Sequence, residues 1–446
     1  MRKPKDLTHG NIRGLLMKLS LPIMGTSFIQ MAYSFTDMAW LGRIGSKSVA
    51  AVGVVSVLVW LANSISSINK TGSEVTVGHA LGRDDISEAS QYASHNITMS
   101  LIISLLLAAI YYFFGRNILQ IYELALDVES VAINYLRIII FGLPFVFMSN
   151  TFSGIYNASG ISSVPFKIMS TGLVMNIILD PLLIFGFKMG AVGAAWATLI
   201  CQLVVFFYFL FHYKRKDRLY AGLKLFVPLQ KSFSEKILKI GLPVAILNSL
   251  FVFVNMYMGR LVSKIGGHVG VATLTTGGQL EAITWNTSQG VTTALGAIVA
   301  QNYTAKKAHR IFKAYKEALN FTFIFGIIGT ILFVFFGQEV FSIIVPDPET
   351  YRVGGEYLKI DGYSQLLMML EITTQGVLYG TGRTMPPAII SVVGNYLRIP
   401  LAWLLLSWGW GLPSIWWAIS ITSMLKGIVA YVYYRSVKRK IAARCA

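Results

Sequence analysis

The sequence predicts an all-α polytopic membrane protein, in which twelve transmembrane helices form two six-helix lobes. Of the 446 residues, 54% are hydrophobic and 13% are charged, which is about half the charged share of a typical soluble protein. Apolar runs long enough to cross a bilayer, about 20 residues each, recur along the whole chain. In addition, motifs of the first half return in the second half at a nearly constant spacing.

Charged residues and Gly or Pro breaks divide the apolar runs into twelve predicted spans. The first six are expected near residues 14–41, 49–81, 93–114, 130–158, 162–187 and 190–213. The second six are expected near 235–263, 271–303, 316–337, 353–379, 384–409 and 411–435. We therefore expect an N-lobe over residues 1–213, a cytoplasmic linker over 214–234 and a C-lobe over 235–446.

The two halves are predicted to have arisen by duplication. "MKLSLPIMG" (17–25) matches "LKIGLPVAI" (238–246), "FFGRN" (113–117) matches "FFGQE" (335–339), and "YLRI" (135–138) matches "YLKI" (357–360). Six spans are an even number, so both halves share one orientation and are expected to be related by a pseudo-two-fold axis along the membrane normal. This architecture favours an alternating-access carrier over a purely structural pair of halves.

Basic residues predict the topology. The net charge is +18, and four basic groups all fall on the same side of a twelve-span chain whose N-terminus is cytoplasmic, as the positive-inside rule requires. An acidic loop at 82–90 is the exception on that side. We expect a multi-pass protein of the cytoplasmic (inner) membrane with both termini cytoplasmic, and no nucleic-acid partner. The groups are Arg2, Lys3, Lys5 and Arg13; Lys214, Arg215, Lys216, Arg218, Lys224, Lys231 and Lys236; Lys306, Lys307, Arg310, Lys313 and Lys316; and Arg435, Lys438, Arg439, Lys440 and Arg444.

Acids inside the first-half spans are not repeated in the second half. Asp37 aligns with Met258, and Asp180 aligns with Ile399 when "NIILDPLL" (176–183) is set on "NYLRIPLA" (395–402). An ionised acid is costly inside a membrane, so it indicates a functional site. The duplication therefore predicts a common scaffold, and the acids predict a site that belongs to the first half alone.

Other polar residues of the first-half spans share helical faces with these acids. Such residues also serve as hydrogen-bonding contacts between membrane helices, which is the simpler explanation for any single Ser or Thr. Two carboxylates together with an amide and a hydroxyl are better explained as a site. The residues are Thr26, Gln30, Tyr33, Ser34 and Asp37 in span one, Asn150, Ser153 and Asn157 in span four, Asn176 and Asp180 in span five, and Thr198 in span six.

The predicted chemistry of this site is cation binding. Two neighbouring carboxylates in a low dielectric cannot both stay ionised unless a proton or a cation compensates them. Carboxylate, amide and hydroxyl oxygens are the ligands that hard cations prefer. Asp37, Asn176, Asp180 and Thr198 are therefore expected to bind Na⁺ or to hold a proton, and the residue types leave both open.

Pro22 is predicted to be a hinge. A proline inside a helix removes one backbone hydrogen bond and kinks the helix, and Pro22 lies about four turns before Asp37. A bend there would move the polar face of span one. The alternative is that Pro22 only marks the beginning of the span.

Further charged residues lie inside predicted spans. Lys70 and Glu74 are one helical turn apart and are expected to compensate each other. The second half contributes charged residues that either line a cavity or pair across helices, and the sequence does not decide which of these forms a second site. They are Glu281, Glu371, Arg398 and Lys426.

The motifs resemble those of MATE (multidrug and toxic compound extrusion) transporters over nearly the whole chain. The resemblance is carried by "LSLPIM" at the start of span one, "SFTDMAWLGRIG" at its end, "YNASGISSVP", "NIILDPLLIFG" and the two six-span halves. It implies export of organic cations and other amphipathic compounds in exchange for Na⁺ or H⁺.

Residue by residue, the resemblance implies the N-lobe cation site of the DinF-like branch. The matching positions are Asp37, Asn176, Asp180 and Thr198, with Pro22 as the bending proline and Tyr135 in the surrounding network. The NorM-like branch adds acids in spans seven and ten, but "PVAILNSLFVFV" (243–254) contains none, and Glu371 lies only near the span-ten position. We further expect Asn150 and Ser153 to support the site, and Gln30, Tyr33, Ser34 and Asn157 to line the substrate cavity.

The expected function is export of amphipathic, cationic small molecules by a cation-coupled antiporter with alternating access. It is expected to act as a monomer among membrane lipids and to need no cofactor besides the coupling ion. The alternative is a flippase for a lipid or lipid-linked oligosaccharide, which would be expected to line its cavity with basic residues. An enzyme is not expected, since H-E-x-x-H, G-x-S-x-G and His-Cys clusters do not occur.

Overall fold

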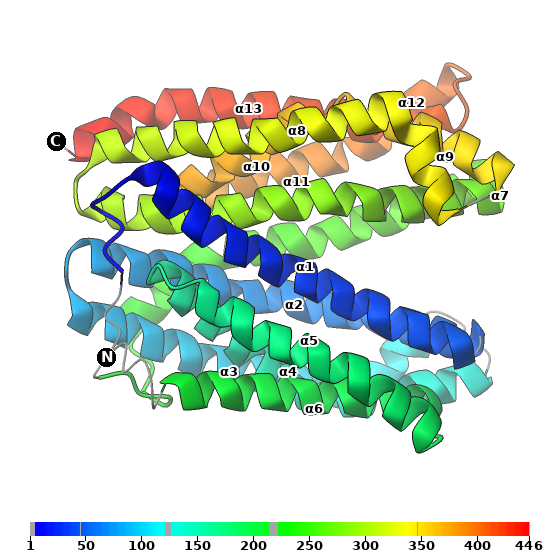
Figure 1. The fold of residues 1–446 in the computed structure, drawn as a ribbon, viewed down its shortest axis with the longest axis horizontal. Coiled ribbons are helices and arrows are strands. Elements are labelled where there is room, and N and C mark those ends of the chain that lie inside the picture. Colours follow the sequence, from blue (N-terminus) through cyan, green and yellow to red (C-terminus); the bar gives the residue numbers. More distant parts are fainter. Residues whose placement is uncertain (1–4, 45, 121–125, 214–221, 346, 446) are drawn as a thin grey trace. The chain divides into compact units, whose positions relative to one another are not determined.

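Helices make up most of the described chain (Figure 1). The computed structural model describes residues 5–44, 46–120, 126–213, 222–345 and 347–445, and within these ranges it contains no strand. The predicted all-α class is therefore confirmed.

The six spans predicted in the first half correspond to six helical segments. The elements are α1 (Ile12–Ile44), α2 (Ser46–Gly82), α3 (Ile86–Gln120), α4 (Leu126–Ala158), α5 (Ser163–Pro181) with the π-helical turn η1 (Leu182–Gly186), and α6 (Gly190–His212). Each overlaps the span expected from its apolar run, and most extend beyond it at one or both ends.

The second half contains the other six spans, but the helix boundaries divide them differently. The elements are α7 (Lys231–Thr304), α8 (Ala308–Ile344), α9 (Pro348–Gly362), α10 (Gln365–Gly380), α11 (Met385–Tyr396), α12 (Arg398–Ser407) and α13 (Pro413–Cys445). The long α7 covers two predicted spans and has a non-helical residue between them, Gly267, with φ 53° and ψ −144°. Only glycine adopts such a conformation readily, so the chain changes direction there.

Ten stretches in the described part of the chain are long and apolar enough to cross a membrane. Two of the twelve predicted spans are missing from this count for simple reasons. α7 counts once although it covers two spans, and the span predicted at 353–379 is divided between α9 and α10, of 15 and 16 residues. The twelve-span architecture follows when both are added.

The helices form two compact units. The first unit comprises Met1–Asp6 and Gly25–Ala245, and the second comprises Leu7–Met24 and Ile246–Ala446. The unit boundaries therefore lie inside α1 and α7, whereas the lobes expected from the sequence are divided at the linker. Of that linker, residues 214–221 lie outside the described ranges. The described part of the linker at 222–230 is not helical. It contacts α3, where Ser94 Oγ accepts a hydrogen bond from Lys224 N at 2.9 Å.

Two apolar clusters stabilise the first unit, because burial of apolar surface is the main favourable contribution to packing. One includes Tyr135 and Phe147 of α4, Ile184 of η1 and Ala194 of α6. The other includes Phe152 and Tyr156 of α4, Ile168 of α5 and Phe209 of α6. On α5 and α6 a stretch of residues lies between the two clusters, whereas on α4 the clusters meet at Phe147 and Met148.

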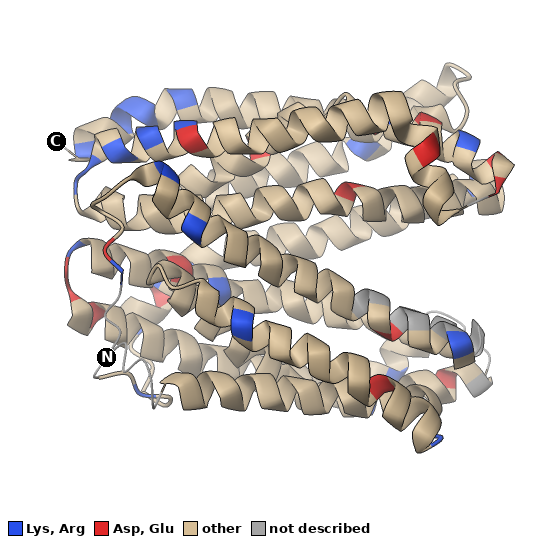
Figure 2. Ribbon diagram, in the orientation of Figure 1, with Lys and Arg blue, Asp and Glu red and all other residues tan. Residues whose placement is uncertain are grey.

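In the second unit, basic residues gather at one end. Figure 2 shows Lys and Arg at the beginning of α8 and at the end of α13. Arg310 Nη1 donates to Gly10 O at 2.9 Å, Lys438 lies over the Phe312 ring, and Arg444 lies over the Tyr303 ring. Members of two of the four basic groups, at the beginning of α8 and at the end of α13, therefore share one end of this unit.

Candidate cation site

The site begins with a local irregularity in the fifth span. Asp180 is followed by Pro181, whose ring nitrogen cannot donate to a carbonyl one turn earlier. The helix continues as the π-helical turn Leu182–Gly186, and π-helical turns are frequent at functional sites. The sequence "LDPLL" therefore places an acid at the point where the regular helix ends.

The polar residues of the site occupy the stretch between the two apolar clusters. On α5, Asn176 and Asp180 lie between Ile168 and Ile184, which belong to different clusters. On α6, Thr198 lies between Ala195 and Phe206, which likewise belong to different clusters. Asn176 and Asp180 are fully buried, and Thr198 is 8% exposed.

Asp37, Asn176, Asp180 and Thr198, here called the four-residue site, come together from three helices. The Asp37 carboxyl group on α1 lies close enough to Asp180, Asn176 and Thr198 to interact with them electrostatically. Within α5, Asn176 Nδ2 donates to Asp180 Oδ1 at 3.1 Å. The structure thus brings together all four residues predicted to bind the cation.

Each residue of the four-residue site keeps a buried oxygen without a hydrogen-bond donor among the described residues. These atoms are Asp37 Oδ1, Asn176 Oδ1, Asp180 Oδ2 and Thr198 Oγ1. Buried polar atoms are nearly always hydrogen-bonded, and each exception needs an explanation. Four unpartnered oxygens in one place are explained if they are ligands for a cation or share a proton.

The oxygen set fits a monovalent cation or a proton. No group of three or more His, Cys, Asp or Glu residues that could hold a metal ion occurs within the described ranges. The four-residue site supplies two carboxylates, one amide and one hydroxyl. Hard cations prefer such oxygen ligands, whereas Zn²⁺ and Cu⁺ select imidazole or thiolate.

Aromatic residues surround the acids. Tyr135 on α4 is 5% exposed and lies within electrostatic reach of Asp37 and Asp180. Tyr33 on α1 is close to Cys201 on α6 and to the same two acids. Three residues after Asp37, the Trp40 ring packs edge to face against the Phe185 ring of η1, with 6.1 Å between the ring centroids.

Other predicted residues lie in a second polar group between α2 and α4. Asn150 Nδ2 donates to Ser66 Oγ at 3.0 Å, and Asn157 Nδ2 donates to Glu74 Oε1 at 3.2 Å. Lys70 acts on Glu74 electrostatically. The structure thus places Asn150 and Asn157 with α2 residues, and no hydrogen bond in the described part joins them to the four-residue site.

The remaining predicted residues are dispersed. Ser153 is buried on α4 and Gln30 is exposed on α1, while the Ser34 side chain lies outside the described part. Pro22 belongs to the second unit, two residues before the boundary that divides α1 between Met24 and Gly25.

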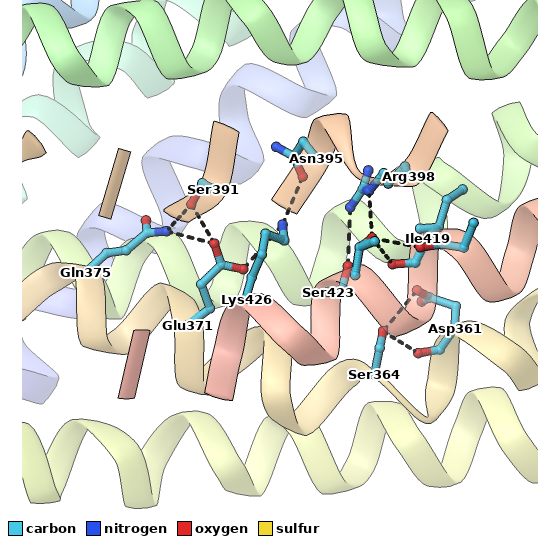
Figure 3. A network of polar contacts seen from close by, with 12 residues as sticks. Asp361, Ser364, Glu371, Gln375, Ser391, Asn395, Arg398, Ile419, Ser423 and Lys426 are labelled. Carbon is cyan, nitrogen blue, oxygen red and sulfur yellow. Dashed lines mark hydrogen bonds and ion pairs between the residues drawn. The ribbon is translucent and has the colours of Figure 1, made fainter. Parts of the chain in front are cut away.

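The second unit contains a polar network that comparison of the repeats did not reveal (Figure 3). Its centre is an ion pair between Lys426 Nζ and Glu371 Oε2 at 3.3 Å. Nearby, Tyr357 donates to Glu281 Oε2 at 3.3 Å, and Asp361 accepts from Gln365 at 2.6 Å. The acids come from α7, α9 and α10 and have no counterparts in the first half, so an alignment of the halves could not predict the network.

Comparison with known proteins identifies the family. A family model named MatE matches residues 22–182 and 243–404, which is most of both halves. The chain is 26% identical over 444 residues to a probable multidrug resistance protein NorM of Thermotoga maritima, covering 96% of this chain and 93% of that protein. It is 22% identical over 419 residues to the multidrug export protein MepA of Staphylococcus aureus, covering 93% and 92%.

Solved structures share the fold. One, described as an outward-facing conformation of a multidrug resistance MATE family transporter of the MOP superfamily, has a TM-score of 0.92 at 21% identity, covering 99% of both chains. Another, described as MATE in the bent conformation, has a TM-score of 0.93 at 21% identity, covering 98% of both chains.

Proposed function

The chain belongs to the MATE family of multidrug efflux transporters, and on this premise we propose that it is an antiporter that exports amphipathic organic cations in exchange for Na⁺ or H⁺. The observation that carries the proposal is the set of four buried oxygens at Asp37, Asn176, Asp180 and Thr198, each without a donor among the described residues. This set provides a site for a coupling cation, and the geometry is compatible with either ion.

Coupling follows from the position of the site on three helices. A cation or proton reduces the repulsion between Asp37 on α1 and Asp180 on α5, which otherwise disfavours their approach. The cation therefore binds the conformation in which α1 lies close to α5 better than one in which they separate, and this differential affinity shifts the equilibrium. An ion gradient can in this way drive a conformational cycle.

The proposed moving element is α1. Pro22 lies two residues before the point at which α1 passes from the second unit to the first, and proline breaks the regular hydrogen-bonding of a helix there. A bend at this point changes the direction of the segment that carries Asp37. Solved relatives have been described in straight and bent conformations, which supports a bending element in the family.

The substrate class follows from charge and family. Relatives are named as a probable multidrug resistance protein and a multidrug export protein, and the four-residue site gives the first unit an acidic, polar region. Amphipathic molecules with a positive charge are therefore the proposed cargo. The proposed location is the cytoplasmic membrane, with both termini at the cytoplasmic, positively charged end.

A flippase for a lipid-linked oligosaccharide is the alternative, and it would need basic side chains for a pyrophosphate. The buried bases of the second unit have other partners. Lys426 contacts Glu371 and Asn395, and Arg398 donates to the hydroxyl groups of Thr422 and Ser423. The structure thus favours the antiporter.

The experiment is a transport assay in proteoliposomes loaded with ethidium, in which a Na⁺ gradient and a pH gradient are imposed separately. The proposal predicts that at least one gradient drives ethidium transport, and the effective gradient identifies the coupling ion. If neither gradient drives ethidium while a fluorescent lipid-linked oligosaccharide crosses the bilayer, the flippase is correct.

A further inference from the structure

One asparagine occupies equivalent positions in the two halves and has different partners in each. Asn176 on α5 aligns with Asn395 on α11. In the first unit, Asn176 Oδ1 is buried and has no donor among the described residues. In the second unit, Asn395 Oδ1 accepts a hydrogen bond from Lys426 Nζ at 3.0 Å.

The Lys426 ammonium group is held by an oxygen set of the kind that binds a cation. It lies 3.3 Å from Glu371 Oε2 and 3.0 Å from Asn395 Oδ1 (Figure 3). The other carboxylate oxygen, Glu371 Oε1, accepts from Ser391 Oγ at 2.6 Å and from Gln375 Nε2 at 3.1 Å. The carboxylate is thereby fixed, and one of its oxygens faces the ammonium group.

The backbone leaves room for the lysine. A Cβ atom added to Gly394 would collide with the Cγ and Cδ atoms of Lys426, so the lysine stem passes directly over this glycine. The equivalent position in the first half is Val205 when Trp196 is aligned with Trp417. Val205 contacts the position of Gly172 and carries no charge. The first unit therefore has no resident base at this place.

We propose that Lys426 is a tethered counter-cation, which provides the second unit with the charge that a cation from solution provides to the first unit. The ammonium group balances the charge of the Glu371 carboxylate and donates a hydrogen bond to the Asn395 amide oxygen. The second unit then needs no external ion at this acid, and the four-residue site alone determines how many ions are exchanged per cycle. This inference rests on the proposed function of the four-residue site.

Other charges surround this pair and stay unchanged in the variants below. Arg398 and Glu281 both act on Lys426 electrostatically. Asp361 lies within electrostatic reach of both Glu281 and Arg398. Because Lys426 and Glu371 are the residues of the second unit that are altered, a new cation response that appears with Lys426→Met can be assigned to the oxygens left around that position, those of Glu371 and Asn395.

The first test measures how Na⁺, compared with choline, and protons change the thermal unfolding temperature of the detergent-purified protein. The Asp180→Asn variant removes the response of the first unit, and Lys426→Met is added to it. The inference predicts that the double variant regains a cation-dependent stabilisation, because Glu371 has lost its resident partner. A further Glu371→Gln change is predicted to abolish the regained response. If Asp180→Asn/Lys426→Met responds no more than Asp180→Asn, the inference is wrong.

The second test avoids an unpaired buried charge, in case Lys426→Met alone prevents folding. The Lys426→Met/Glu371→Gln variant carries neither charge of the pair, and it is predicted to bind as many cations per protein as the wild type. If Na⁺ stabilises the protein, this number is measured as bound ²²Na⁺ per protein. If only pH has an effect, it is measured as the number of protons released per protein. Fewer bound cations would show that the pair itself takes an ion from solution and would overturn the inference. If wild type and Asp180→Asn bind equally, it is instead the proposed function of the first unit that fails.

Discussion

Asn176 donates a hydrogen bond from Nδ2 to Asp180 Oδ1 across one turn of α5, at 3.1 Å. This bond orients the asparagine so that its Oδ1 atom, which is buried, has no donor among the described residues. Asn176 therefore fixes one carboxylate and offers an oxygen of its own. The relationship defines the four-residue site as a set of acceptors that require a cation or a shared proton.

Thr198 is predicted to contribute a neutral ligand. Thr198→Ala removes the unpartnered Oγ1 atom, and the loss of one neutral interaction of this kind costs about 0.5–1.5 kcal/mol, or roughly a two- to tenfold lower cation affinity. Thr198→Ser keeps the hydroxyl group and should retain most of the affinity. A cation titration followed by Trp40 fluorescence, with Trp40→Phe as the blank, measures both. Equal loss in the two variants would show that packing, and not the oxygen, matters.

Gly193 is predicted to set the position of η1 and hence of Asp180. A Cβ atom at Gly193 would lie 2.8 Å from the carbonyl carbon and oxygen of Leu183, so Gly193→Ala must displace the backbone. Overpacking of this kind costs about 1–3 kcal/mol. We expect a lower unfolding temperature and a weaker cation response, although no ligand is removed.

The matched control is Gly53→Ala on α2, where an added Cβ atom has no heavy atom within 4 Å. In a helix this change should be neutral or slightly stabilising. If Gly193→Ala and Gly53→Ala have the same cation response, the position of η1 does not determine the site.

Pro22 is predicted to control the rate of the cycle and not the binding of the cation. Pro22→Ala restores the backbone hydrogen bond that proline lacks and stiffens α1 next to the unit boundary. An increase of about 1.4 kcal/mol in the barrier corresponds to tenfold slower transport. Transport kinetics and equilibrium cation binding, measured on the same protein, separate the two effects.

Pro144→Ala is the control for Pro22→Ala. Pro144 lies inside α4, which belongs entirely to the first unit. It should therefore change the stability of this unit more than the transport rate. A comparable loss of transport in both variants would show that any proline-to-alanine change in a span has this effect.

The sequence predicted the all-α fold and the shared face of Asn176 and Asp180, because both depend on patterns within single helices. Apolar length predicts a span, and the spacing of Asn176 and Asp180 predicts a shared face. The unit boundaries inside α1 and α7 could not be predicted, because they depend on which helix packs against which. A hydrophobic pattern does not specify the neighbour of a membrane helix.

The same limit explains the residues that lie elsewhere. Asn150 and Asn157 share a face of α4, but this face meets Ser66 and Glu74 of α2. The Glu371–Lys426 pair joins α10 to α13, and the sequence left open whether these residues pair or line a cavity. Glu371 and Lys426 are 55 positions apart in the chain, and only the packing of the helices brings them together.

The most direct test of the account is gradient-driven ethidium transport by Asp37→Asn and Asp180→Asn in proteoliposomes. Either change removes a charged ligand, for which a loss of about 1.5–3 kcal/mol is expected. Asp84→Asn is the control, because Asp84 is exposed in the turn after α2 and has φ 59°, which asparagine also tolerates. The account predicts that Asp84→Asn transports like the wild type, whereas both site variants are folded, still bind ethidium and respond to neither a Na⁺ nor a pH gradient. Gradient-driven transport at the wild-type rate in either site variant would contradict it.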